Sequence, residues 1–201
     1  YYGYHHVMGN ISGNQDKPRF MAYAGGDLRF DEDSKLAGWT RPITVTRPEG
    51  YERLKMFMAF NLTIPGIPVI YYGDEIGMTG ANDPDNRRMM RFTGLQPDEE
   101  DVKATVARLA ALRLQNLELT YGDFHWLLVE DDVLAYARSY FGQLTVVVFN
   151  KSPHAASLLL PLPAGFTRDS FHDQLKTPVE NTDGLLQVDI EADSFMIIQN
   201  H

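Results

Sequence analysis

The sequence predicts a mixed fold, in which an α/β segment is followed by an all-β segment. In the first half, stretches with helical apolar periodicity alternate with short apolar runs. After about residue 118 the pattern changes to short strand-like runs separated by turn residues. We therefore expect two domains, residues 1–117 and residues 118–201. A chain of 201 residues is long enough to give each of them a core.

Two apolar runs in the first half are predicted to be strands. Residues 7–12 form a short run, and residues 67–72 form a continuous run typical of a strand covered on both faces. With a helix after each, they give the order strand, helix, strand, helix, which is the repeat of a parallel α/β fold. Two such units cannot close a sheet alone, and an eightfold barrel needs roughly 250 residues. We therefore expect a fragment of a larger domain.

The first half of the sequence also predicts one long loop and two helices. A polar stretch at residues 25–46 is longer than most loops in compact domains, which marks it as functional or disordered. Thr46 and Glu49 have the spacing of a capping box that opens a helix, and Pro65 stops that helix. Its apolar face is predicted to be formed by Tyr51, Leu54, Phe57, Met58 and Leu62. A second amphipathic helix is predicted at about residues 98–116, with its apolar face formed by Val102, Val106, Leu109, Leu112 and Leu117.

The second half predicts antiparallel strands. Asp131-Asp132 and residues 141–143 separate the first three runs as hairpin turns would. We expect a β-sandwich, with Trp126 in its core and no exposed aromatic platform on its strands. The predicted strands are Phe124–Val129, Val133–Tyr140, Leu144–Asn150, Ala156–Leu160, Leu185–Ile190 and Phe195–Gln199.

Composition excludes several classes of function. The net charge of −9 and the scattered basic residues argue against nucleic acid. The absence of cysteine excludes disulfides and thiolate zinc sites. No run approaches the ~18 consecutive apolar residues of a membrane helix, so no membrane partner is expected. No signal peptide opens the chain, which carries little weight if the start is processed or artificial. We expect a periplasmic or extracellular rather than a cytoplasmic location.

Polar residues follow both predicted strands of the first half. Asn14-Gln15-Asp16 comes after the first strand, and Asp74-Glu75 comes after the second. In a βα barrel the active site lies at these carboxyl ends. Taken alone, the first group reads as a polar turn and the second as a helix cap or solvated turn, so neither identifies a site by itself.

Together with their neighbours, these residues resemble a known family. The segment 13–20 (GNQDKPRF) resembles the fourth conserved region of the alpha-amylase family, usually Asn-His-Asp and often followed by arginine. The segment 66–78 looks like the family's last barrel strand and its loop, and 80–88 (GANDPDNRR) is similar to a loop of neopullulanases, cyclomaltodextrinases and oligo-1,6-glucosidases. Residues 111–113 with 121–124 resemble the exit into the C-terminal β domain. The resemblance implies the last two βα units of a (β/α)8 TIM barrel, followed by an antiparallel β-sandwich domain.

The resemblance also implies roles for individual residues. Asp16 matches the third family carboxylate, which stabilises the oxocarbenium-like transition state through sugar hydroxyls. Asn14, Gln15 and Arg19 are the candidate substrate-binding residues; Asn14 would orient the loop, and Arg19 would pair with nearby carboxylates. Gln15 replaces the usual histidine. An amide can keep the hydrogen bond to the sugar but cannot titrate near neutral pH, so that contact would lose its pH dependence.

The implied function is hydrolysis of α-1,4-linked glucose oligosaccharides or polysaccharides with retention. The family takes its nucleophile, in an Arg-x-Asp motif, and its acid/base glutamate from earlier strands, so this chain is expected to be inactive without an N-terminal barrel segment. Alternatives are a 4-α-glucanotransferase, an inactive binding or scaffold protein, and a carbohydrate-binding β domain. The open barrel predicts either self-association or loose order in the first hundred residues.

No cofactor is expected, and the metal signals are weak. Asp83 and Asp85 have oxygen ligands suited to calcium, but turn chemistry explains them equally well. His5 and His6 would point to opposite faces of a strand and do not form a metal pair. Trp39, in the polar stretch, is the aromatic residue that could face a sugar.

Overall fold

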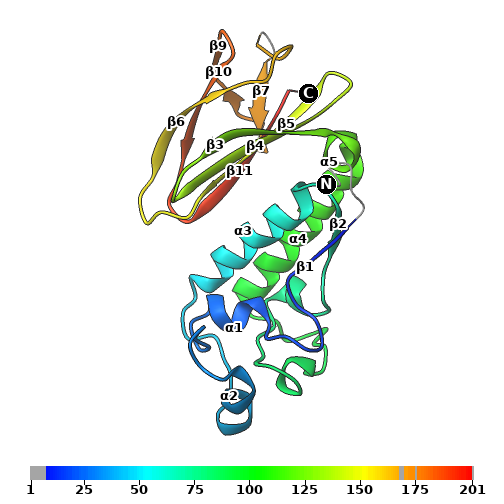
Figure 1. Ribbon diagram of the computed structural model, residues 1–201, viewed down its shortest axis with the longest axis vertical. Helices are drawn as coiled ribbons and strands as arrows, with labels where there is room; N and C mark the ends of the chain where they lie inside the picture. Colours follow the sequence, from blue (N-terminus) through cyan, green and yellow to red (C-terminus); the bar gives the residue numbers. More distant parts are fainter. Residues whose placement is uncertain (1–7, 168–169, 175, 201) are drawn as a thin grey trace. The chain divides into compact units, whose positions relative to one another are not determined.

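The computed structural model describes residues 8–167, 170–174 and 176–200 (Figure 1). The chain divides into two units: residues 8–62 with 67–111 form an α/β unit, and residues 63–66 with those from 112 onward form a β unit. The elements in chain order are β1 (Gly9–Ile11), α1 (Phe20–Ala24), α2 (Ser34–Thr40), α3 (Gly50–Thr63), β2 (Ile67–Val69), η1 (Asp74–Ile76), η2 (Asp85–Arg87), α4 (Pro97–Gln115), α5 (Leu117–Tyr121), β3 (Asp123–Val129), β4 (Val133–Tyr140), β5 (Gln143–Asn150), β6 (Ala156–Pro161), β7 (Phe171–Asp173), β8 (Pro178–Val179), β9 (Asn181–Thr182), β10 (Leu185–Ile190) and β11 (Ser194–Gln199).

The two predicted strands of the α/β unit pair with each other in parallel. Gly9 lies opposite Ile67, and Ile11 lies opposite Val69. The run at 67–72 was expected to be covered on both faces, and this expectation is wrong for the described residues: Ile11 is 53% exposed and Ile67 52% exposed. The apolar pattern was that of a buried strand, but with only β1 and β2 in this sheet too few neighbouring elements pack on it to bury it.

The two long helices match their predicted apolar faces. In α3, Leu54, Met58 and Leu62 are buried, and in α4 the three residues Val102, Val106 and Leu109 are buried. The predicted capping box is wrong, because α3 begins at Gly50 and the Thr46 hydroxyl donates to the Gly25 carbonyl instead. Leu117 does not belong to the face of α4 either, because it opens the short helix α5 and is half-exposed.

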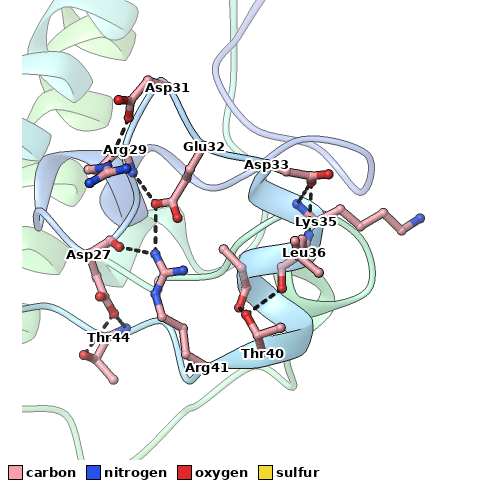
Figure 2. A network of polar contacts seen from close by, with 11 residues as sticks. Asp27, Arg29, Asp31, Glu32, Asp33, Lys35, Leu36, Thr40, Arg41 and Thr44 are labelled. Atoms are coloured by element: carbon pink, nitrogen blue, oxygen red, sulfur yellow. Dashed lines mark hydrogen bonds and ion pairs between the residues drawn. The ribbon is translucent and has the colours of Figure 1, made fainter.

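The polar stretch at residues 25–46 is an ordered structure, not a bare loop. Helix α2 lies inside it, and the Asp33 carboxylate caps this helix by accepting from the amides of Lys35 and Leu36. Figure 2 shows how Arg41 closes the stretch, donating to the Asp27 carbonyl and to Glu32 at 2.8 Å each. A small core supports it, formed by Ala22, Leu28, Ala37, Ile43 and Ala81. In the sequence, Asp33 followed by Ser34 is the pattern that could have predicted the start of this helix.

The β unit consists of two antiparallel sheets that share one core. In its described part, one sheet has the order β3-β4-β5-β11-β7-β8, and the other has the order β6-β10-β9. Buried side chains from both sheets form one cluster, so the unit is a sandwich as predicted. All six predicted strands are present. Strands β7, β8 and β9 were missed because each is only two or three residues long.

Arginines satisfy the backbone carbonyls where α3 ends, within the β unit. Arg138 on β4 donates to the carbonyls of Thr63, Leu119 and Gly122, at 2.9 to 3.0 Å. Arg113 donates to the carbonyls of Ile64 and Gly66. The last carbonyls of a helix have no partner inside it, and cations favour that end. These bonds make residues 63–66 part of the β unit, whereas the domain boundary at residue 117 remains a prediction.

Trp126 was predicted to be in the core of the sandwich, and this is wrong. Its side chain is 55% exposed on β3, which lies at the edge of the larger sheet. An edge strand has a neighbour on one side alone, so fewer side chains cover it. Among the described residues, no helix is long and apolar enough to cross a membrane.

The exposed apolar side chains of β1 and β2 predict self-association of the isolated chain. Ile11 and Ile67 are half-exposed in neighbouring strands, and such surfaces favour contact between copies. We expect light scattering to give a mass above the monomer, and we expect Ile11→Lys to lower it. A compact monomer in scattering, with the first hundred residues fully protected in hydrogen exchange, would contradict this.

Candidate functional site

The site lies where β1 and β2 end. The segment 13–20 follows β1, and the segment 70–88 follows β2. Because the two strands are parallel neighbours, their carboxyl ends meet at one edge of the sheet, which is where barrel enzymes bind substrates. The sequence predicted this meeting, and the contacts between the two segments are extensive.

Asp16 presents its carboxylate to solvent from a short turn. Its side chain is 65% exposed. Its backbone amide donates to the Asn14 side-chain oxygen at 2.8 Å, which fits the loop-orienting role expected of Asn14. The Gln15 amide donates to the Asp16 carboxylate at 3.1 Å. Asn14 and Gln15 therefore both act on the position of Asp16, and its carboxylate remains accessible to a ligand.

Arg19 holds the two segments together from inside. Its guanidinium donates to the Asp74 carboxylate and the Tyr72 carbonyl through Nη1, at 2.8 and 2.7 Å, and to the Asn86 carbonyl through Nε at 3.0 Å. Its Cζ lies 4.5 Å from the ring centre of Tyr71 and 4.9 Å from that of Tyr72. A side chain with no exposed surface does not touch a glucan. We therefore replace the substrate-binding assignment of Arg19 with the structural one.

Asn86 fixes the turn that carries Asp16. Its side-chain amide donates to the carbonyls of Asn14 and Lys17, at 2.9 and 2.7 Å. The residue is completely buried in η2, although asparagine is usually found at the surface. Sequence reasoning missed this role, because an asparagine in a Gly- and Asp-rich stretch has the signature of an ordinary turn residue.

Asp74 is the acidic partner of Arg19 and lies in a crowded pocket of its own. A Cβ atom at Gly13 would come 3.0 Å from a carboxylate oxygen of Asp74, so the end of β1 approaches this side chain closely. Gly73, with φ of 87°, makes the turn that places Asp74, and a Cβ there would clash with Met78. Burial raises the pKa of Asp74 to about 6, and the Arg19 guanidinium acts in the opposite direction.

Arg87 links the turn to a second acidic residue. Its Nε donates to the Gln15 carbonyl and pairs with Asp83, at 3.0 Å each, and its Nη2 lies 3.4 Å from the Asp16 carboxylate. Lys35 also lies near Asp83, at 3.8 Å. The exposed rim of the site therefore alternates in charge, and Asp16 has a cation at one side.

Asp83 and Asp85, which were considered for metal binding, form ion pairs instead. Asp83 pairs with Arg87, and Asp85 pairs with Arg88. Within the part of the chain that the structure describes, no group of three or more His, Asp or Glu side chains could hold a metal ion. His5 and His6 lie outside the described residues. Trp39 on α2 is 69% exposed, so its proposed sugar contact stays a prediction.

Comparison with known proteins identifies the family. Residues 5–113 match the family model described as alpha amylase, catalytic domain. The chain belongs to the alpha-amylase family. The resemblance seen in the sequence motifs is thereby confirmed, and the matched residues include both segments of the site.

Individual relatives and a solved structure show how similar the chain is to particular proteins. The chain is 34% identical over 157 residues to a cyclomaltodextrinase of Geobacillus thermopakistaniensis, covering 77% of the chain and 23% of that protein. It is 33% identical over 123 residues to a cyclomaltodextrin glucanotransferase of Bacillus sp. strain 1011, covering 61% and 17%. The alpha-amylase of Geobacillus thermoleovorans, solved with acarbose, superposes with a TM-score of 0.74 at 27% identity, over 96% of this chain and 38% of that one. This alpha-amylase-family chain thus spans about a quarter of its curated relatives or less.

Removing Arg19 should destabilise the α/β unit strongly. Arg19→Ala leaves the Asp74 carboxylate buried without its partner, which costs about 3–5 kcal/mol. Arg29→Ala is the matched control, because Arg29 pairs with Asp31 at the surface and such pairs contribute about 1 kcal/mol or less. Urea unfolding at pH 7 measures both. If both variants lost the same small amount of free energy of unfolding, Arg19 would not hold the site together.

The raised pKa of Asp74 predicts a pH-dependent stability. Between pH ~4 and ~6 the folded chain retains a proton that the unfolded chain has released, so ionisation of Asp74 destabilises the fold as the pH rises. Asp74→Asn removes this term. Relative to that variant, the wild-type free energy of unfolding should fall by about 2 kcal/mol between pH 4 and 6.5. If the difference in free energy of unfolding between the wild type and Asp74→Asn did not change with pH, the pKa of Asp74 would not be raised.

Proposed function

We propose that this chain is the C-terminal portion of a retaining α-glucan hydrolase, and that Asp16 is the transition-state-stabilising carboxylate of its active site. In this proposal residues 1–117 supply the last two βα units of a (β/α)8 barrel, and residues 118–201 supply the C-terminal β domain. The nucleophile and the acid/base belong to an N-terminal barrel segment, so the chain alone does not hydrolyse a glycoside. The substrate is an α-1,4-linked glucose oligosaccharide or polysaccharide.

The position of Asp16 supports this proposal most directly. It is an exposed carboxylate at the carboxyl end of a parallel strand, on a turn fixed by Asn14 and Asn86. A carboxylate held in advance near developing positive charge stabilises an oxocarbenium-like transition state without reorganising. An inactive scaffold would have no use for this geometry. Gln15, beside Asp16, can still donate to a sugar hydroxyl.

A glucanotransferase remains the second candidate, and the relatives give it a specific basis. Among them, proteins named cyclomaltodextrin glucanotransferase match the chain at 32–35% identity. Hydrolysis and transfer share one glycosyl-enzyme intermediate and differ in whether water or a sugar hydroxyl accepts the glycosyl group. Products from maltoheptaose distinguish the two: oligosaccharides longer than the substrate indicate transfer, and shorter ones alone indicate hydrolysis.

Asp16→Asn in the whole protein should lower kcat on maltoheptaose by about 10²–10³-fold, because the amide cannot stabilise positive charge. The fold should not change, because the side chain is mostly exposed. Asp31→Asn is the matched control, since Asp31 is also mostly exposed and pairs only with Arg29 among the contacts of this polar stretch. Steady-state kinetics measures both. Full activity of Asp16→Asn would overturn the assignment.

A further inference from the structure

A small hollow in the β unit has the lining of a sugar-binding site. It measures about 300 Å³, which is the lower end of the range for small-molecule pockets. The β4–β5 turn, the start of β3 and the loop after β6 build it, and its lining is Asp123, Ser139, Tyr140, Phe141, Gly142 and Phe166. All of these residues belong to the β unit. Aromatic rings next to hydroxyl and carboxylate groups suit a ligand that has both apolar faces and hydroxyls.

The rings at this hollow form a cluster that is open to solvent. The ring of Phe141 lies edge-on to that of Tyr140, with centres 4.6 Å apart, and Tyr121 of α5 lies 6.2 Å from Tyr140. Phe141 is 91% exposed and Tyr121 is 60% exposed. Figure 1 shows α5 at the end of the large sheet where the β4–β5 turn lies. We expected no aromatic platform on the strands, and this cluster forms where β4 ends, from Tyr140, the turn residue Phe141 and Tyr121 of α5.

The backbone at Phe141 indicates that its position is functional. Tyr140 pairs with Gln143, so Phe141 and Gly142 form a two-residue turn, with φ of 45° and 82°. Turns of this kind favour Asn-Gly, because both positions need a positive φ. A phenylalanine in this conformation is strained, and with its ring in solvent no burial offsets the strain. Strained residues of this kind cluster at ligand sites.

The turn is also fixed in place. The Asn200 side chain donates to the Gly142 carbonyl at 2.9 Å and accepts from the Leu144 amide at 2.8 Å. On the other wall, the Ser139 hydroxyl is hydrogen-bonded to His125, at 2.8 Å. A site whose walls are already ordered loses less freedom when it binds a ligand. These contacts fix the Tyr140 and Phe141 rings at the surface before a ligand binds.

We propose that this hollow binds the end of an α-glucan chain, with the Phe141 and Tyr140 rings against a sugar face and with Asp123 and Ser139 at its hydroxyls. The described lining residues include the Asp123 carboxylate and no lysine or arginine, which disfavours an anionic ligand and favours a neutral polyhydroxyl one. The choice of α-glucan over other sugars rests on the proposed function. The β unit then anchors a polymer on which the whole protein acts.

Titration of the ¹⁵N-labelled 201-residue chain with maltoheptaose tests this site. We expect saturable amide shifts at residues 139–143, and none with cellohexaose, which has β linkages. Phe141→Asn should weaken binding by about tenfold or more through loss of the ring, while raising the melting temperature because asparagine suits the turn. The gain in stability separates lost binding from misfolding.

Two further variants serve as controls. Phe141→Tyr keeps a ring and should bind like the wild type. Leu159→Asn removes another exposed apolar side chain elsewhere in the β unit and should also leave binding unchanged. No shifts at residues 139–143 at millimolar maltoheptaose, equal shifts with cellohexaose, or unchanged binding by Phe141→Asn would each overturn the proposal. Shifts confined to residues 13–20 would overturn it too, while supporting the proposed function.

Discussion

The ion pair between Arg19 and Asp74 is the contact on which the candidate site depends. It is completely buried, and it joins the segment after β1 to the segment after β2. Burying two charges costs desolvation free energy, which the raised pKa of Asp74 reflects, and the hydrogen bonds and ring contacts around the cation offset part of that cost. Arg19 has these in the carbonyls of Tyr72 and Asn86 and in two tyrosine rings. With Asn86 held in this way, its own amide can fix the turn of Asp16.

Arginine side chains bonded to backbone carbonyls recur through the chain. Arg41 and Arg88 reach carbonyls in the polar stretch, and Arg113 and Arg138 reach carbonyls at the end of α3. Irregular segments leave many carbonyl groups without a partner from a helix or sheet, and burying them unpaired is costly. One guanidinium with five N–H donors can satisfy several of them. The long connections of this fold are therefore ordered by side chains more than by their own secondary structure.

Sequence patterns were sufficient for the parts of the fold that periodicity governs. The apolar faces of α3 and α4 and six strands of the sandwich follow directly from spacing. The pattern could not reveal burial that depends on neighbouring elements, which is why Ile67 and Trp126 are exposed against expectation. It also missed Asn86, because the same residue type serves in a solvated turn and in a buried network. Asp16 was predicted from family resemblance, and the contacts by which the two loops hold it became apparent only in three dimensions.

The same limit explains the cluster at Phe141. Its sequence, Phe-Gly between two strands, reads as a simple hairpin turn, and the hollow beside it also needs Phe166, which is distant in the sequence. Its positive φ distinguishes this phenylalanine from the other exposed ones, Phe30 and Phe92, and the residue type alone does not reveal that conformation. The candidate sites of this molecule thus lie mainly on loops and turns that a rigid scaffold positions.

A crystal structure of the whole protein with a bound maltooligosaccharide would test the central claim most directly. The account predicts that an Asp16 carboxylate oxygen accepts a hydrogen bond from a sugar hydroxyl, at about 2.5–3.0 Å. It also predicts that Arg19 remains buried against Asp74, with Asn86 still holding the turn. A sugar bound in the barrel without contact to Asp16, or an Arg19 side chain turned toward the sugar, would contradict the account.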